Sequence, residues 1–134
     1  MARYLLDSVI VIDHLNGVEA ATKFLAARGR DCVISVITRA ETLAGFPSAS
    51  EPLARELLDR FAAIPVTVEV ADAAARLRRT QRWKLPDAIQ AAIAIQEGLT
   101  LVTRNTRDFK AGGPITVETP YQIPDTFKRK NAAT

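Results

Sequence analysis

The chain of 134 residues contains one cysteine, one histidine and no charge-free run longer than nine residues. A single cysteine, Cys32, excludes an intrachain disulfide, and its apolar neighbours predict a buried thiol. A lone histidine, His14, without a cysteine motif excludes the clustered nitrogen and sulfur ligands of a zinc site. A membrane-spanning helix needs about 20 consecutive apolar residues, so none is expected. Asp7 and Asp13 interrupt the apolar stretch near the start, which argues against a signal peptide. Asp13 lies six residues after Asp7, off its helical face, and is expected to face solvent. We therefore expect a cytoplasmic protein that does not enter a membrane.

The remaining composition is that of an ordinary globular domain, with 48% hydrophobic and 25% charged residues. The length favours a single core, which we expect over residues 1–123, followed by a flexible basic tail over residues 124–134. A net charge of +3 and a pI near 9.4 favour a polyanionic partner. One basic cluster would either contact that partner or form a solvated helix face: Arg76, Arg78, Arg79, Arg82 and Lys84.

Short apolar runs alternate with longer helical patterns, which predicts an α/β fold with a central parallel sheet of four to five strands flanked by helices. The expected strands are residues 3–6, 32–36, 66–68, 100–103 and 115–117. The expected helices are residues 9–15, 19–27, 39–44, 51–62, 71–80 and 87–97. Thr38 and Glu41 have the spacing of a capping box, Pro86 fits a first helical position, and Gly98 fits a left-handed position after a last turn.

Four acidic residues follow predicted strand ends or open predicted helices: Asp7, Glu41, Asp87 and Asp108. Each one taken alone is explained by helix capping or by a turn. Together they would lie near the carboxyl edge of the sheet, where ligands of parallel α/β proteins gather. Carboxylates about 5 Å apart repel each other by roughly 3 kcal/mol, so such a group either takes up protons or holds a cation. Because all the donors are oxygens, Mg²⁺ or Mn²⁺ is favoured over Zn²⁺.

Such an ion activates water for attack at phosphorus and stabilises the leaving oxygen, which points to phosphodiester chemistry. Ser8 and Thr103, each at a strand end, are placed to support a metal ligand, a water or a phosphate. Asn105 would fix the turn that bears Asp108. The flanking Arg104 and Arg107 would either hold a phosphate or balance the carboxylates, and Arg82 and Lys84 are further candidates for contacting the substrate.

Four segments in this order resemble the PIN-domain ribonucleases of the VapC type, the toxins of toxin–antitoxin pairs. The segments are Tyr-Leu-Leu-Asp-Ser at 4–8, Ala-Glu-Thr-Leu-Ala-Gly at 40–45, Leu-Pro-Asp-Ala-Ile-Gln-Ala-Ala at 85–92 and Thr-Arg-Asn-Thr-Arg-Asp-Phe at 103–109. The resemblance runs from about residue 3 to residue 120. It implies a PIN-like fold and metal-dependent endonucleolytic cleavage of RNA.

The resemblance also implies roles and partners. Asp7 and Asp87 would be the principal metal ligands, and Glu41 and Asp108 would complete the site directly or through water. The implied partners are an RNA substrate, a VapB-type antitoxin and a second copy of the chain in a homodimer. Antitoxins of this kind often insert a basic side chain into the acidic site and lay a helix on an apolar groove.

Two other classes of function are weighed against this one. A PIN-like binding module without catalytic activity would keep the fold but usually lose one or more acids, and all four are present. A phosphotransfer domain would need an aspartate after a middle strand or Asp-x-Asp after the first strand. Residues 65–70 offer no aspartate, and the first strand is followed by Asp7, Ser8 and Val9.

Overall fold

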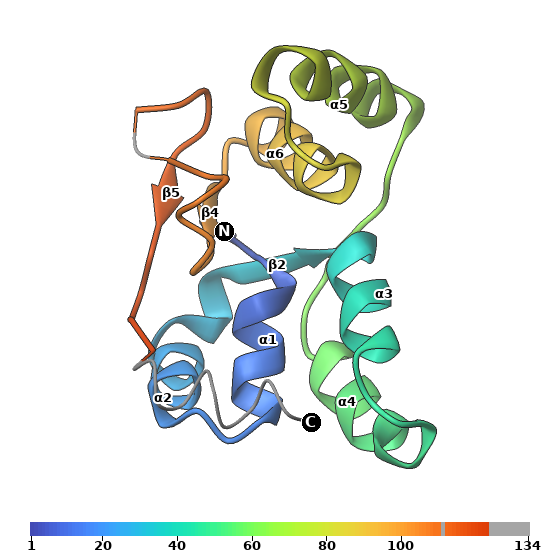
Figure 1. Cartoon of the computed structure of the whole chain (residues 1–134). Coiled ribbons are helices and arrows are strands. Elements are labelled where there is room, and N and C mark those ends of the chain that lie inside the picture. Colours follow the sequence, from blue (N-terminus) through green and yellow to red (C-terminus); the bar gives the residue numbers. More distant parts are fainter. Residues whose placement is uncertain (111, 124–134) are drawn as a thin grey trace.

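Five short parallel strands form the centre of the protein, in the order β3-β2-β1-β4-β5 (Figure 1). The computed structural model describes residues 1–110 and 112–123. The strands are β1 (Tyr4–Leu6), β2 (Cys32–Ser35), β3 (Ala63–Ile64), β4 (Thr100–Val102) and β5 (Val117–Glu118). The predicted α/β fold with a parallel sheet of four to five strands is confirmed. The expected tail over residues 124–134 lies outside the described residues.

Helices cover both faces of the sheet (Figure 1). They are α1 (Ser8–Leu15), α2 (Glu19–Arg28), α3 (Val36–Ala44), α4 (Glu51–Leu58), α5 (Val68–Gln81) and α6 (Leu85–Glu97). Side chains alternate across a strand, so neighbours in sequence enter different cores. Leu5 and Leu101 pack with α5 and α6, whereas Leu6 and Val102 pack on the opposite face with α1 and α4. No helix among the described residues is both long and apolar enough to cross a membrane.

The connection between α4 and α5 differs from the prediction. The strand expected at residues 66–68 is wrong: the chain pairs with β2 three residues earlier, at Ala63–Ile64, and Val68 already begins α5. The reason is a helix cap, because the hydroxyl of Thr67 accepts a hydrogen bond from the Val70 N–H at 3.1 Å. The helix expected over 51–62 ends at Leu58, since the following residues turn into β3.

The start of α3 also differs. The capping box of Thr38 and Glu41 is wrong, because α3 begins at Val36 and Ser35 caps it by accepting from the Thr38 N–H at 3.1 Å. The Thr38 hydroxyl donates instead to the Leu6 carbonyl at 3.0 Å, which ties α3 to β1. Glu41 therefore lies in the second turn of α3. The prediction for Gly98 is confirmed, because Gly98 ends α6 in the left-handed conformation. Pro86 lies in the first turn of α6, one position later than predicted.

Candidate active site

Asp7 lies at the carboxyl end of β1 and caps α1. Its Oδ1 accepts from the Ser8 N–H at 2.9 Å, and its Oδ2 accepts from the Thr103 hydroxyl at 2.6 Å. The second contact follows from the sheet register, because Leu6 pairs with Val102 and the next residue of each strand is therefore a neighbour. Asp7 is only 7% exposed. Burial raises its pKa, and the hydrogen bonds from Thr103, Ser8 and Gln90 offset part of that rise.

Glu41 belongs to the same group of acids. Its side chain is open to solvent, yet the surrounding protein removes part of its hydration and Asp7 repels it, so its pKa is raised. A hydrogen bond with the Ser8 side chain lowers the pKa and offsets part of this effect. Ser8 thus donates to Asp7 through its backbone and acts on Glu41 through its side chain, and its supporting role at the site stays a prediction.

Asp87 lies in the first turn of α6, and its pKa depends on the charges of the other three acids. Desolvation and the charges of Asp7, Asp108 and Glu41 raise the pKa of Asp87 to about 6, while Lys84 lowers it. Each of the other three predicted acids therefore acts on this one carboxyl group. The three charges lie near enough to Asp87 to raise its pKa, although no three acids of the described residues surround one ion position.

Asp108 is held by the turn that follows β4. Asn105 Nδ2 donates to Asp108 Oδ2 at 2.9 Å, and the Asp108 N–H donates to Asn105 Oδ1 at 3.3 Å. The Asn105 N–H donates in turn to the hydroxyl of Thr103 at 2.9 Å. The expected role of Asn105 in fixing this turn agrees with these bonds. The indole N–H of Trp83 donates to the Asp108 carbonyl at 2.7 Å, so this buried tryptophan anchors the turn from the other side.

A buried polar network beneath the acids was missed by the sequence analysis. Gln90 of α6 is 1% exposed; its Oε1 accepts from the Ser35 hydroxyl at 2.6 Å, and its Nε2 donates to the Thr38 hydroxyl at 2.7 Å. Gln90 thereby joins α6 to the start of α3, and it also lowers the pKa of Asp7. The signal in the sequence was a glutamine between apolar residues of the helix, one turn after Asp87.

Arg104 forms an ion pair with Asp13, whose burial was not predicted from the sequence. Asp13 was expected to face solvent, but it is 5% exposed and accepts from Arg104 Nε at 2.6 Å and Nη2 at 3.0 Å. The Tyr121 hydroxyl donates to the same carboxylate at 2.7 Å. The expectation for Asp13 was wrong because the chain after β5 covers this end of α1. Arg104 still lowers the pKa of Asp7, so it balances negative charge from a fixed position.

The other predicted contacts for substrate lie on the surface. Arg82, Lys84 and Arg107 are exposed and form no ion pair among the described residues. Arg82 adopts a left-handed conformation at the end of α5, with φ of 59°. The substrate-binding role of these residues stays a prediction.

The donor set suits a hard divalent cation without forming a closed cage. No group of three or more His, Cys, Asp or Glu side chains in residues 1–110 and 112–123 is already arranged around one ion position. Mg²⁺ is commonly held by one or two carboxylates, with water and substrate phosphate oxygens as the other ligands. The crowding of acids around Asp87 is the feature that such an ion would relieve. The residues present therefore fit the metal, with Asp7 and Asp87 as the candidate ligands.

This fold and its acidic edge define a known class of protein. Residues 4–113 match the model of the PIN domain, and the chain belongs to the PIN-domain family. The resemblance noted in the sequence is confirmed at the level of the family.

Particular relatives narrow the comparison. The chain is 36% identical over 127 residues to Ribonuclease VapC10 of Mycobacterium tuberculosis, a match that covers 90% of this chain and 94% of the relative. It also resembles a chain of a toxin-antitoxin complex from Klebsiella pneumoniae, with 39% identity, a TM-score of 0.82 and coverage of 90% and 99% of the two chains. FitAcB from Neisseria gonorrhoeae is similar at 25% identity and a TM-score of 0.74, with coverage of 90% and 99%.

Proposed function

We propose that this protein is a metal-dependent endoribonuclease that acts as the toxin of a type II toxin–antitoxin pair. The observation that carries the proposal is the shared electrostatic effect of Asp7, Glu41 and Asp108 on Asp87. The ribonuclease relative and the similar chain in a toxin–antitoxin complex support the same function. RNA in the cytoplasm is the substrate on this proposal.

Mg²⁺ or Mn²⁺ is the proposed cofactor. When bound, such an ion lowers the pKa of a coordinated water and stabilises the leaving oxygen of a phosphodiester. Asp7 and Asp87 would hold it, with Glu41 and Asp108 completing the site directly or through water. Thr103 and Ser8 orient the Asp7 carboxylate by donating to its two oxygens.

Other residues of the chain position the acids and offset part of their negative charge. The Asn105 turn fixes Asp108 at the edge of the site, and Arg104 offsets some of the negative charge from its place beside Asp13. In the overall reaction the oxygen of a water molecule bonds to phosphorus and the bond to one ribose oxygen breaks. The proton lost by the water passes to a nearby base, and the leaving oxygen gains a proton. A carboxylate with a pKa near 6, such as Asp87, is ionised at neutral pH and is therefore able to hold an ion or accept a proton.

Cleavage of RNA with and without metal tests the proposal. Purified protein should cut RNA when Mg²⁺ or Mn²⁺ is added, and EDTA should stop the cleavage. Asp7→Asn and Asp87→Asn should each reduce the rate at least 100-fold, because each removes a charged metal ligand. Asp72→Asn is the matched control, since Asp72 is exposed on α5 and makes no ion pair among the described residues. Full activity in both site variants would overturn the assignment.

A measurement of metal binding distinguishes the proposed ribonuclease from an inactive binding module. An ion that binds only the folded protein stabilises it by about 2.7 kcal/mol at 100 times its dissociation constant. We therefore expect Mn²⁺ to raise the melting temperature of the parent protein. Asp7→Asn should lose this shift. An absence of any shift in the parent, together with no cleavage, would favour the binding module.

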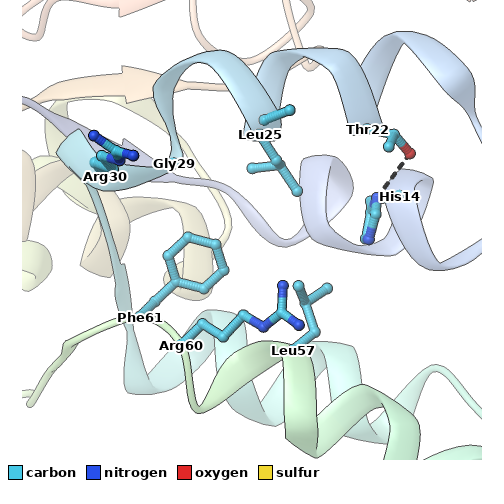
Figure 2. Close-up of a pocket in the computed structure, with 9 residues that line it drawn as sticks. His14, Thr22, Leu25, Gly29, Arg30, Leu57, Arg60 and Phe61 are labelled. Carbon is cyan, nitrogen blue, oxygen red and sulfur yellow. Dashed lines mark hydrogen bonds between the residues drawn. The ribbon is translucent and has the colours of Figure 1, made fainter.

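A VapB-type antitoxin is the proposed partner, and an apolar cavity offers a place for it. The cavity of about 410 Å³ lies among α1, α2 and α4, where Leu25, Leu57 and Phe61 face it with Arg30 and Arg60 beside them (Figure 2). None of the four acids lines it. A helix of the partner with an apolar face fits this cavity, and an extension of the same partner would have to reach the acids.

The partner is tested by co-expression with the product of the reading frame next to the gene for this chain. We expect the complex to lose ribonuclease activity and Leu57→Arg to release the inhibition. The free Leu57→Arg protein should still cut RNA, since Leu57 lies outside the acid group. Size measurements of the complex would also test the proposed homodimer. Continued inhibition of Leu57→Arg would place the partner elsewhere.

A further inference from the structure

A second cavity lies directly beside the acid group. It has a volume of about 240 Å³ and is bounded by the end of α5 and by the chain after β4. Asp108 lines it, together with Trp83 and Phe109. Asp108 is one of the four acids, so the cavity and the acid group have this residue in common.

Positive charge surrounds this cavity on its exposed side. Arg82, Arg107 and Lys110 line it, all three are exposed, and none forms an ion pair among the described residues. Other exposed arginines of the described residues, such as Arg60 and Arg79, also lack an ion pair, so these three cations are distinguished by lining one cavity together. Unpaired cations around a concave site next to carboxylates favour a ligand that carries phosphate.

Part of the cavity lining is apolar. Trp83 and Phe109 are both buried, with ring centroids 5.2 Å apart, and the Trp83 N–H is already bonded to the Asp108 carbonyl. Pro114 and Ile115 line the same cavity. Apolar residues and cations that line one cavity match the two parts of a nucleotide, a flat base and a charged phosphate.

We propose that this cavity binds one unpaired nucleotide of the substrate RNA, next to the phosphodiester that is cut. The inference rests on the ribonuclease function proposed above and adds the place and the form of the substrate. At about 240 Å³ the cavity is below the roughly 300–1,000 Å³ of sites that enclose a drug-sized ligand, so it excludes a paired segment and would enclose only part of one nucleotide. Arg82, Arg107 and Lys110 contact its phosphates, and Pro114 and Ile115 contact its base.

RNA binding by charge-matched variants tests the site. The double variant Arg107→Ala/Lys110→Ala removes two of the cations, and Lys23→Ala/Arg55→Ala removes two exposed charges of α2 and α4 that do not line the cavity. Affinity for a labelled single-stranded RNA is measured in an Asp7→Asn background, so that no cleavage occurs. The cavity variant should bind at least tenfold more weakly than the control. Its slope of log affinity against log salt should be smaller by about 1.4, the value for two lost phosphate contacts on a single strand.

Steady-state kinetics and RNAs that lack single bases provide two further tests of the nucleotide site. In the active protein the cavity variant should raise KM tenfold or more and change kcat less than threefold, because the acids are untouched. Arg82→Asn tests the third cation separately, because asparagine tolerates the left-handed conformation that Arg82 adopts. An RNA series with one abasic position at a time should show one weak position, adjacent to the cut. A uniform abasic series would overturn the single-nucleotide site.

The outcomes separate this proposal from the ribonuclease proposal. If the parent cuts no RNA with either metal, the proposed function fails. If the parent cuts RNA and the cavity variant behaves like the control, the ribonuclease stands and the nucleotide site fails. If the cavity variant binds and cuts RNA normally but escapes the antitoxin, the surface belongs to a protein partner and the nucleotide site is overturned.

Discussion

Asp87 shows how a single residue reports on its neighbours. An unfolded aspartate has a pKa near 3.9, whereas Asp87 in the folded protein has a pKa of about 6. Between these values the folded protein holds more protons than the unfolded chain. The free energy of unfolding therefore falls as the pH rises from about 4 to about 6, and it stays lowered above that window.

Asp87→Asn removes this penalty in metal-free protein. We expect it to stabilise the fold at pH 7.5 by on the order of 1 kcal/mol, because solvent screens part of the shift, and to change little at pH 4. Urea unfolding in EDTA at the two pH values measures the effect, with Asp72→Asn as the control. An equal effect at both pH values would contradict the repulsion inferred from the four acids.

Gln90 stabilises the fold through its hydrogen bonds with Ser35 and Thr38. Gln90→Leu keeps the size of the side chain but leaves the buried hydroxyls of Ser35 and Thr38 without this partner. An unsatisfied buried polar group costs about 1–3 kcal/mol, so we expect a loss of stability in that range. Gln96→Leu, on the exposed part of the same helix, should cost less than about 0.5 kcal/mol. Equal unfolding free energies for the two variants would show that the network does not stabilise the site.

At the scale of the element, α6 depends on how it ends. Gly98 has φ of +66° and no heavy atom within 4 Å of an added Cβ, so a substitution there meets strain and no clash. Gly98→Ala should destabilise the protein by about 1 kcal/mol. Gly29→Ala has the same open surroundings but a right-handed φ of −56°, and it should be neutral or slightly stabilising. Thermal unfolding of the pair isolates the cost of the left-handed conformation, and equal melting temperatures would contradict it.

At the scale of the whole molecule, Asp13 connects three parts of the chain. Its carboxylate on α1 accepts from Arg104 after β4 and from Tyr121 after β5. Removing one member of a buried pair leaves an uncompensated charge, which costs about 3–5 kcal/mol. We expect Asp13→Ala to destabilise by roughly 3 kcal/mol and Tyr121→Phe by about 1 kcal/mol.

The control for this cluster is a surface ion pair. Asp59 lies 2.9 Å from Arg39 but its side chain is 60% exposed, so Asp59→Ala should cost less than about 1 kcal/mol. Denaturant unfolding of Asp13→Ala and Asp59→Ala compares the buried and exposed cases directly. Similar losses would mean that burial of Asp13 contributes nothing to the pair.

Local chemistry along the sequence was enough to predict several features. Apolar runs identified β1, β2 and β4, because strands buried on both faces carry apolar residues at consecutive positions. Asp7, Asp87 and Asp108 were found because each follows a strand or opens a helix, and Gly98 because a left-handed residue commonly ends a helix. These features depend on residues within a few positions of each other.

Other features depend on residues that meet only after folding. The strand at 63–64, the cap at Ser35, the bonds of Gln90 and the burial of Asp13 were missed or mistaken, since their partners lie 29 to 108 positions away or compete with a nearer candidate. The cavity beside Asp108 likewise joins the end of α5 to the chain after β4. The sequence by itself determined the α/β class and the acidic residues, because periodicity and residue type are local properties. Tertiary structure alone decided which polar groups are buried and which charges stay free, because burial depends on packing between distant segments.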